Sequence, residues 1–407
     1  MRSSDRIMAR HRGSIQFSNR DMDFTFNYLL GQADLLTGHG PLFATAQRIR
    51  GASPSAWRRE FGRLADHAHR QTTAAHAAGG TAQARLWALT DCYANRAALQ
   101  YTDPESASFT DRWQRMEEAF STAMAYWSAP VSAIEVPWQP ASLPGYLVKL
   151  DDQPRPAIVM VGGGDTSRED LFCFAGLPAW QQGYNAILVD LPGQGSTPAR
   201  GMYFTVDMAR PIRAVIDHLY RLLPYTTRVA IYGVSGGGYF SCQAVAEDSR
   251  IAAWIAATPI HDIAEVFRQE FGAALGVPGW LPRLLLKGTG GFNEATELSL
   301  KRYAWQFGTS DFVQAVEQVY QQARSVDHTA INCPALFCYS TAEGPELRRQ
   351  TGVLARALRS RGVPVTLRRC TAIEGADAHC QINNLRLAHA VIFDWLAGCL
   401  GPVASAR

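Results

Sequence analysis

The segment RVAIYGVSGGGYF, residues 228–240, decides the fold of this 407-residue chain. Its first part, 228–233, is an apolar and β-branched run that predicts a buried strand. The next part, GVSGG (233–237), is a G-x-S-x-G motif followed by a helix-compatible segment. A serine on a sharp strand-to-helix turn needs such glycines, because neighbouring backbone passes close to it. The Oγ of Ser235 would then stand clear at the sheet end, with the amide of Gly236 pointing to where an oxyanion forms. The alternative is a glycine-rich turn with a bystander serine.

Short apolar runs alternate with helical segments along most of the chain. Between two of these runs, the segment 211–223 places its large apolar residues at helical spacing on one face. Near-continuously apolar strands separated by helices predict an α/β fold, a doubly wound and mostly parallel sheet covered on both faces. Two further strand-like runs lie at 133–138 and 146–150. The main candidate strands are 156–161, 185–191, 228–233, 252–258, 335–340 and 365–370.

The first third of the chain has a helical pattern instead. A helical run at 55–100 is interrupted at Gly79-Gly80, and Thr110-Asp111 can cap the helix that follows. We therefore expect an N-terminal helical domain over 1–132 and a catalytic domain over 133–407. Residues of about 263–330 are also mostly helical, which is long for a connection between strands and favours an insertion before the next strand.

Composition excludes several classes of function. The chain is 47% apolar and 18% charged, with a net charge of +3 spread along its length, so neither disorder nor binding to nucleic acid or an anionic membrane is indicated. The eight cysteines form no C-x-x-C pair, so neither a zinc site nor a disulfide scaffold is expected. No apolar run approaches the length of a membrane span or a signal peptide. We expect a cytoplasmic protein without metal or cofactor, and the sequence leaves open whether it forms a homodimer.

A second glycine-rich turn, VGGGDTSRED (161–170), follows the strand 156–161. Its backbone can supply a second oxyanion donor, from the amide of Gly164 in preference to Gly163. Dinucleotide binding is the competing interpretation, but the turn lacks the G-x-G-x-x-G spacing. The later turn DLPGQG (190–195) is expected to line the site without chemistry of its own.

If serine, acid and histidine follow one another along the chain, the general base is one of the histidines after Ser235, which are His261, His328, His379 and His389. His379 is preferred because it lies in a glycine-containing loop between the last strand and the final helix. His261 follows the strand 252–258 and is a second candidate, whereas His389 lies inside the final helix.

Three carboxylates could orient that histidine. Glu343 stands just past the strand 335–340 and is preferred. Asp262 stands past the strand 252–258, and Glu346 opens a helix, where a carboxylate also stabilises the helix N-terminus. Asp262 and Glu346 therefore stay as alternative acids.

These motifs resemble the α/β-hydrolase family. The resemblance rests on GGGDTSRED, DLPGQGST, GVSGGGYF, EGPELRRQ and EGADAHCQ, and it is narrower to the branch with a helical N-terminal domain. That branch includes 2,6-dihydroxypseudooxynicotine hydrolase, the fermentation–respiration switch proteins and fungal hydrolases that shorten polyketide pyrones. The resemblance implies that Ser235 is the nucleophile, His379 the base and Glu343 the acid, a position where several relatives carry Asp. It also implies hydrolysis of an ester, or of a C–C bond next to a ketone, in an aromatic or polyketide-like compound.

The function expected from the sequence is a serine-nucleophile hydrolase of a small-molecule ester, thioester or β-diketone-like C–C bond. Two alternatives remain. The same residues could transfer the acyl group within or between substrates, as an acyltransferase or cyclase does. The scaffold could also be a non-catalytic ligand-binding protein, since a fold does not fix a function.

Overall fold

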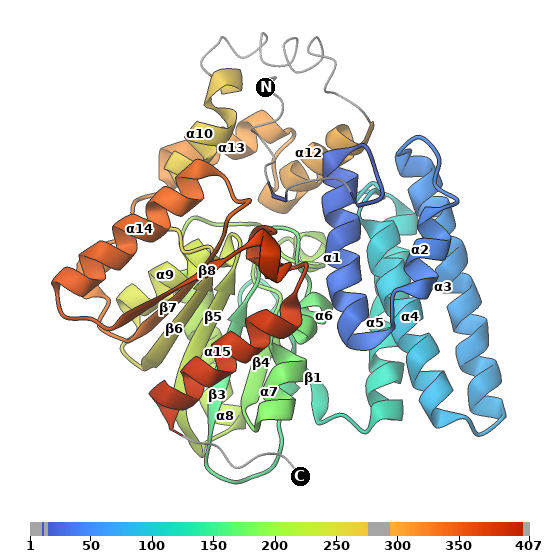
Figure 1. The fold of residues 1–407 in the computed structure, drawn as a ribbon, viewed down its shortest axis with the longest axis horizontal. Coiled ribbons are helices and arrows are strands. Elements are labelled where there is room, and N and C mark those ends of the chain that lie inside the picture. Colours follow the sequence, from blue (N-terminus) through green and yellow to red (C-terminus); the bar gives the residue numbers. More distant parts are fainter. Residues whose placement is uncertain (1–9, 12–14, 276–293, 402–407) are drawn as a thin grey trace. The chain divides into compact units, whose positions relative to one another are not determined.

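The computed structural model describes residues 10–11, 15–275 and 294–401 (Figure 1). Its contacts divide the chain into two compact units, a sheet unit and a helical unit. The sheet unit is Met1–Arg12, Pro130–Gly276 and Gln306–Arg407. The helical unit is Gly13–Ala129 and Val277–Trp305. Part of the segment interpreted from the sequence as an insertion, residues 294–305, is thus assigned to the helical unit, and residues 276–293 of that segment lie outside the described residues.

The sheet unit contains eight strands in the order β1-β2-β4-β3-β5-β6-β7-β8. Strand β2 is antiparallel to both of its neighbours, β1 and β4, and every other neighbouring pair is parallel. The predicted mostly parallel sheet is therefore confirmed. The strands are β1 (Val131–Pro137), β2 (Ser142–Val148), β3 (Arg155–Val161), β4 (Asn185–Val189), β5 (Thr226–Val234), β6 (Ile251–Ala257), β7 (Ala335–Ser340) and β8 (Val365–Cys370).

Helices cover both faces of this sheet. On one face, α8 (Ala209–Leu222), α9 (Gly237–Glu247) and α14 (Pro345–Ser360) pack their apolar side chains against alternate strand residues in one continuous core. On the other face, α15 (Leu385–Leu400) contacts β6, and the π-helical turn η2 (Phe172–Gly176) contacts β4 (Figure 1). The sheet unit also contains α6 (Arg168–Leu171), α7 (Leu177–Gln182), α10 (Ile263–Leu275), α13 (Phe312–Gln322), η3 (Thr197–Arg200), η4 (His328–Ala330), η5 (Ala372–Glu374) and η6 (His379–Gln381).

The direction of the strand connections reverses between β3, β4 and β5. The connection after β3 leads to β4 on one side, and the connection after β4 returns past β3 to β5 on the other. Consecutive connections that leave in opposite directions open a crevice at the carboxyl ends of the strands between them, which is where α/β sheets bind ligands. The turns 162–164 and 235–237 follow those ends of β3 and β5.

The helical unit is built around a separate aromatic core. Trp57 and Phe61 are fully buried there and pack ring against ring, and Tyr101 meets Trp57 edge to face. The predicted break at Gly79-Gly80 is confirmed, since it separates two long helices. The predicted cap at Thr110-Asp111 is wrong, because the hydroxyl of Ser106 accepts the N–H of Phe109 and starts the helix earlier. The helices are α1 (Arg20–Leu36), α2 (Gly40–Ala46), α3 (Pro54–Ala77), α4 (Thr81–Leu99), α5 (Ala107–Trp127) and most of α12 (Glu294–Phe307).

Across the ranges that the structure describes, no helix combines the length and the apolar character needed to cross a bilayer.

Candidate active site

Ser235 stands on a sharp turn between β5 and α9. Its φ is +55°, in the left-handed region that a non-glycine residue rarely adopts and that clusters at functional sites. The two flanking glycines of the motif allow the close approach that this turn requires. A Cβ on Gly233 would lie 2.2 Å from the carbonyl oxygen of Gly237, and a Cβ on Gly237 would lie 2.3 Å from that of Val161. The glycines that the sequence pointed to are thus needed sterically.

His379 is brought to Ser235 by the loop between β8 and α15. Its Nε2 lies 2.9 Å from the Oγ of Ser235, within hydrogen-bond distance, although the residues are 144 positions apart. The loop is fixed on both sides of the imidazole. The backbone N–H of His379 donates to the carbonyl oxygen of Arg10 at 2.7 Å, and the amide of Gln381 donates to the hydroxyl of Ser340 at 2.8 Å.

The other candidate histidines lie elsewhere. The Nδ1 of His261 lies 3.1 Å from the hydroxyl of Ser325, and the ring of His261 lies edge-on to that of His328. His389 lies within α15, as the sequence indicated, where burial lowers its pKa to about 4. His379 is therefore the candidate histidine that the structure brings to Ser235.

Glu343 contacts the opposite side of the same imidazole. Its Oε1 lies 2.8 Å from the Nδ1 of His379, and its side chain is 1% exposed. Two further donors hold the carboxylate: the backbone N–H of Ser340 reaches Oε2 at 3.0 Å, and the hydroxyl of Thr258 donates to Oε1. A carboxylate at Nδ1 favours the tautomer that carries its proton there, which leaves the Nε2 lone pair facing Ser235.

The electrostatic environment favours a proton on this imidazole. Burial alone would lower the pKa of His379, but its interactions with Cys380 and with the Glu343 carboxylate outweigh burial and raise the pKa above its ordinary value. The imidazolium formed by accepting a proton from Ser235 would therefore be stabilised in place.

The glycine-rich turn after β3 lies against the serine turn. A Cβ on Gly163 would lie 2.6 Å from the Cβ of Ser235, and the backbone nitrogen of Gly164 lies 3.7 Å from where a Cβ of Gly236 would stand. Among the described residues, the amides of Gly164 and Gly236 donate to no acceptor. Both N–H groups can therefore serve an anion beside Ser235.

Two glutamines fix this turn, and the sequence interpretation missed both. The amide of Gln194, from the turn expected to be without chemistry, donates to the carbonyl oxygens of Gly162 at 2.7 Å and Gly163 at 3.0 Å. Gln306 donates to the carbonyl oxygen of Gly164. Because these glutamines hold the carbonyl oxygens of the turn, the backbone N–H of Gly164 can point away from them, toward Ser235. The only signal in the sequence was a glutamine inside a glycine-rich turn.

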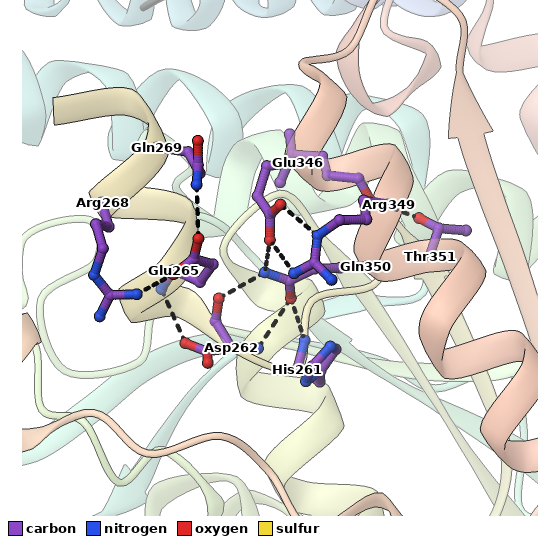
Figure 2. A network of polar contacts seen from close by, with 10 residues as sticks. His261, Asp262, Glu265, Arg268, Gln269, Glu346, Arg349, Gln350 and Thr351 are labelled. Carbon is purple, nitrogen blue, oxygen red and sulfur yellow. Dashed lines mark hydrogen bonds and ion pairs between the residues drawn. The ribbon is translucent and has the colours of Figure 1, made fainter. Parts of the chain in front are cut away.

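The alternative acids, Asp262 and Glu346, belong to a different network, shown in Figure 2. The side-chain oxygen of Gln350 accepts the backbone N–H groups of His261 and Asp262, both at 3.0 Å. The amide nitrogen of Gln350 donates to the carbonyl oxygen of Asp262 and to Oε1 of Glu346, both at 2.8 Å. Glu346 also pairs with Arg349 at 2.6 Å. The Gln350 side chain thus joins α14 to the start of α10, and the Asp262 carboxylate accepts the backbone N–H of Glu265 at 2.9 Å. Of the three carboxylates, Glu343 is the one that contacts His379.

Among the described residues, no three His, Cys, Asp or Glu side chains lie close enough together to hold a metal ion.

Comparisons with known proteins show that the chain is similar to fungal hydrolases over nearly its whole length. It is 27% identical over 415 residues to Hydrolase LUC6 of Fusarium sp, covering 95% of this chain and 98% of that protein. It is 25% identical over 413 residues to 20-hydroxy-prefusarin hydrolase FUS2 of Gibberella moniliformis, covering 93% and 96%. No family model matches the chain. These relatives support an enzyme of the hydrolase class.

Solved structures share the fold. The 2,6-dihydroxy-pseudo-oxynicotine hydrolase superposes with a TM-score of 0.67 at 17% identity, covering 93% of this chain and 98% of the other. AbyA5 superposes with a TM-score of 0.62 at 15% identity, covering 93% and 95%. The predicted α/β-hydrolase fold with helices ahead of the sheet is confirmed, as is the resemblance stated from the motifs.

Proposed function

We propose that this chain, which has the α/β-hydrolase fold, is a serine-nucleophile hydrolase that acts on a small-molecule substrate. One observation carries the proposal: the imidazole of His379 lies between the Oγ of Ser235 at 2.9 Å and the Oε1 of Glu343 at 2.8 Å. A hydroxyl, an imidazole and a buried carboxylate in this order form the triad that activates a serine. All three residues come from the sheet unit, which we propose as the catalytic domain.

The proposed reaction begins with proton transfer within this triad. Nε2 of His379 takes the proton of Ser235 as its Oγ attacks a carbonyl carbon, and Glu343 stabilises the resulting imidazolium. The amides of Gly164 and Gly236 donate to the tetrahedral oxyanion, where a single donor is worth about 3 kcal/mol. Collapse of this intermediate releases the leaving group, which receives the proton from His379. Water, deprotonated by His379, then attacks the acyl-enzyme and frees Ser235.

The leaving group decides which bonds the site can cleave. An alcohol or a thiol leaves readily from an ester or a thioester once it is protonated. A carbon leaving group needs its own adjacent carbonyl to hold the electron pair as an enolate, so C–C cleavage requires a β-diketone-like substrate. The names of FUS2 and of the pseudo-oxynicotine hydrolase give small organic molecules as the compounds that those proteins hydrolyse, which supports a small-molecule substrate here.

The alternatives give different products from the same site. If the acyl group passes to a hydroxyl or amine instead of water, the product mass lacks the added water that hydrolysis gives. If the protein only binds its ligand, Ser235 does not react.

Labelling with a fluorophosphonate tests the proposal without knowledge of the substrate. We expect the reagent to attach to Ser235, identified by peptide mass spectrometry, and the variant Ser235→Ala to remain unlabelled with an unchanged circular dichroism spectrum. A screen of aryl esters against β-diketones, read by product mass, then separates the bond types. A folded wild-type protein that fails to label at residue 235 would refute the nucleophile.

A further inference from the structure

Thr258 directly follows β6 and has a backbone conformation that threonine strongly disfavours. Its φ is +77°, and its side chain is fully buried. A β-branched residue in the left-handed region is a true outlier, since its side chain crowds the backbone there. Such conformations persist only where the surroundings enforce them, and they gather where function needs them.

The surroundings that enforce this conformation lie beside Ser235. The backbone N–H of Thr258 donates to the carbonyl oxygen of Cys338 at 3.0 Å, and that of Ser235 donates to the carbonyl oxygen of Ala257 at 3.1 Å. The carbonyl oxygen of Thr258 packs so closely on α9 that a Cβ on Gly238 would lie 2.0 Å from it. The turn after β6 is thus locked to β7 on one side and to the serine turn on the other.

The side chain of Thr258 lies against both the proposed acid, Glu343, and the proposed base, His379. The hydroxyl of Thr258 donates to Oε1 of Glu343, the same oxygen that meets Nδ1 of His379. Its Oγ1 also lies 3.5 Å from that Nδ1. Because a glutamate places its carboxylate at the end of three rotatable bonds, the Thr258 hydroxyl and the Ser340 amide together hold the carboxylate plane in the orientation that meets Nδ1.

We propose that Thr258 is a positioning residue, whose hydroxyl holds the Glu343 carboxylate against the imidazole of His379. The catalytic consequence of this inference rests on the proposed function, whereas the hydrogen bond between Thr258 and Glu343 does not. A buried hydroxyl that only filled space would not need a strained backbone aimed at one carboxylate oxygen.

Two variants separate the hydroxyl from the space it fills. Thr258→Val keeps the branched shape and removes the hydroxyl, whereas Thr258→Ser keeps the hydroxyl and removes the methyl group. A hydrogen bond to a charged group is worth enough to expect roughly a 10- to 100-fold slower fluorophosphonate labelling of Ser235 in Thr258→Val. Thr258→Ser should label at close to the wild-type rate. Equal rates in wild type and Thr258→Val, or equal losses in both variants, would overturn the role of the hydroxyl.

The titration of His379 gives a readout that a space-filling role would not move. The titratable groups that raise its pKa are Glu343, from the loop after β7, and Cys380, in its own loop, and both variants retain them. Without the Thr258 donor, the carboxylate is no longer held against Nδ1 and stabilises the imidazolium less. The pH midpoint should therefore fall by about one unit in Thr258→Val and stay in place in Thr258→Ser.

That midpoint can be measured by NMR on protein carrying ¹⁵N-labelled histidine, with the His379 signals identified by their loss in His379→Gln. An unchanged or raised midpoint in Thr258→Val contradicts the inference. The NMR result stands even if the wild-type protein fails to label at Ser235. That failure would remove the proposed function, while a lowered midpoint in Thr258→Val would still support the hydrogen bond on which the inference depends.

Discussion

The Nδ1 of His379 lies 2.8 Å from the Oε1 of Glu343, a residue that stands three positions beyond the end of β7. Glu346, only three residues further, opens α14 and hydrogen-bonds Gln350 instead. Both are glutamates near the carboxyl end of one strand, and both lie at the start of the same connection. Their different surroundings make them a matched pair for testing which carboxylate serves the imidazole.

Replacing Glu343 by Gln should slow the labelling of Ser235 by roughly a thousandfold or more. The amide is nearly isosteric but carries no charge, so it neither stabilises the imidazolium nor enforces the proton on Nδ1. The second-order rate of fluorophosphonate labelling measures this loss without a known substrate. The matched control, Glu346→Gln, should label at close to the wild-type rate because its partners are Arg349 and Gln350. Equal losses in both variants would contradict the assignment of the acid.

The labelling rate should rise with pH. His379 must be neutral to take the proton of Ser235. Burial lowers the pKa of His379, but its interactions with Cys380 and Glu343 outweigh burial and hold the pKa above its ordinary value. The midpoint of the rise should therefore lie above about 6.5, the ordinary value for histidine. Burial lowers the pKa of both His261 and His389, so neither of these would produce such a midpoint.

Glu343→Gln supplies the control for the pH profile, since removing one of the groups that raise the pKa of His379 should move the midpoint down. A wild-type midpoint at or below about 6.5, or one unaffected by this substitution, would show that another group limits the reaction.

The parts of the fold that follow from local patterns were predictable. Each candidate strand from 156–161 onward overlaps a strand of the sheet. A strand buried on both faces needs an apolar run, as in β3 to β7, whereas β8 lies at the sheet edge and is largely exposed. The sequence placed Ser235 and Glu343 just past strand ends and His379 in the loop between the last strand and the final helix, and the structure has them there. The sequence favoured Glu343 over Asp262 and Glu346 but left all three open, because carboxylates past strand ends look alike until side-chain directions are known.

Contacts between distant segments could not be predicted. Nothing in the run ending at Thr258 shows a positive φ, because that conformation is imposed by Gly238 and Cys338 from other strands and helices. The hydrogen bonds of Gln194 to the turn after β3 likewise depend on two connections that meet only in the folded sheet. Helical periodicity in 263–330 identified helices but carried no information on which compact unit each helix joins.

Gly237→Ala should destabilise the protein by about 1–3 kcal/mol and slow the labelling of Ser235. The new Cβ would lie 2.3 Å from the carbonyl oxygen of Val161 and 2.7 Å from that of Gly162, and backbone atoms of the sheet cannot move aside cheaply. Any relief would displace the turn that carries Gly164. Urea unfolding and the labelling rate measure the two effects.

Gly398→Ala is the control for this glycine. It lies on the exposed side of α15 with no atom within 4 Å of its Cβ position, so it should be neutral or stabilise the helix by up to about 1 kcal/mol. Similar unfolding midpoints for Gly237→Ala and wild type would contradict this prediction, because they would show that the turn after β5 accommodates a side chain at position 237.

Gln350→Leu should destabilise the protein by about 2 kcal/mol, because the backbone N–H groups of His261 and Asp262 both lose their acceptor. Gln350 is fully buried, so water cannot simply replace it.

Arg349→Gln is the control: it removes only a surface ion pair with Glu346, worth about 0–1 kcal/mol. Urea unfolding compares the two. Under native conditions the folded fraction of Gln350→Leu should still label at Ser235, since the Gln350 network orients the start of α10 rather than His379. If both substitutions destabilise the protein equally, the effect would come from the ion pair between Arg349 and Glu346 and not from the buried amide of Gln350.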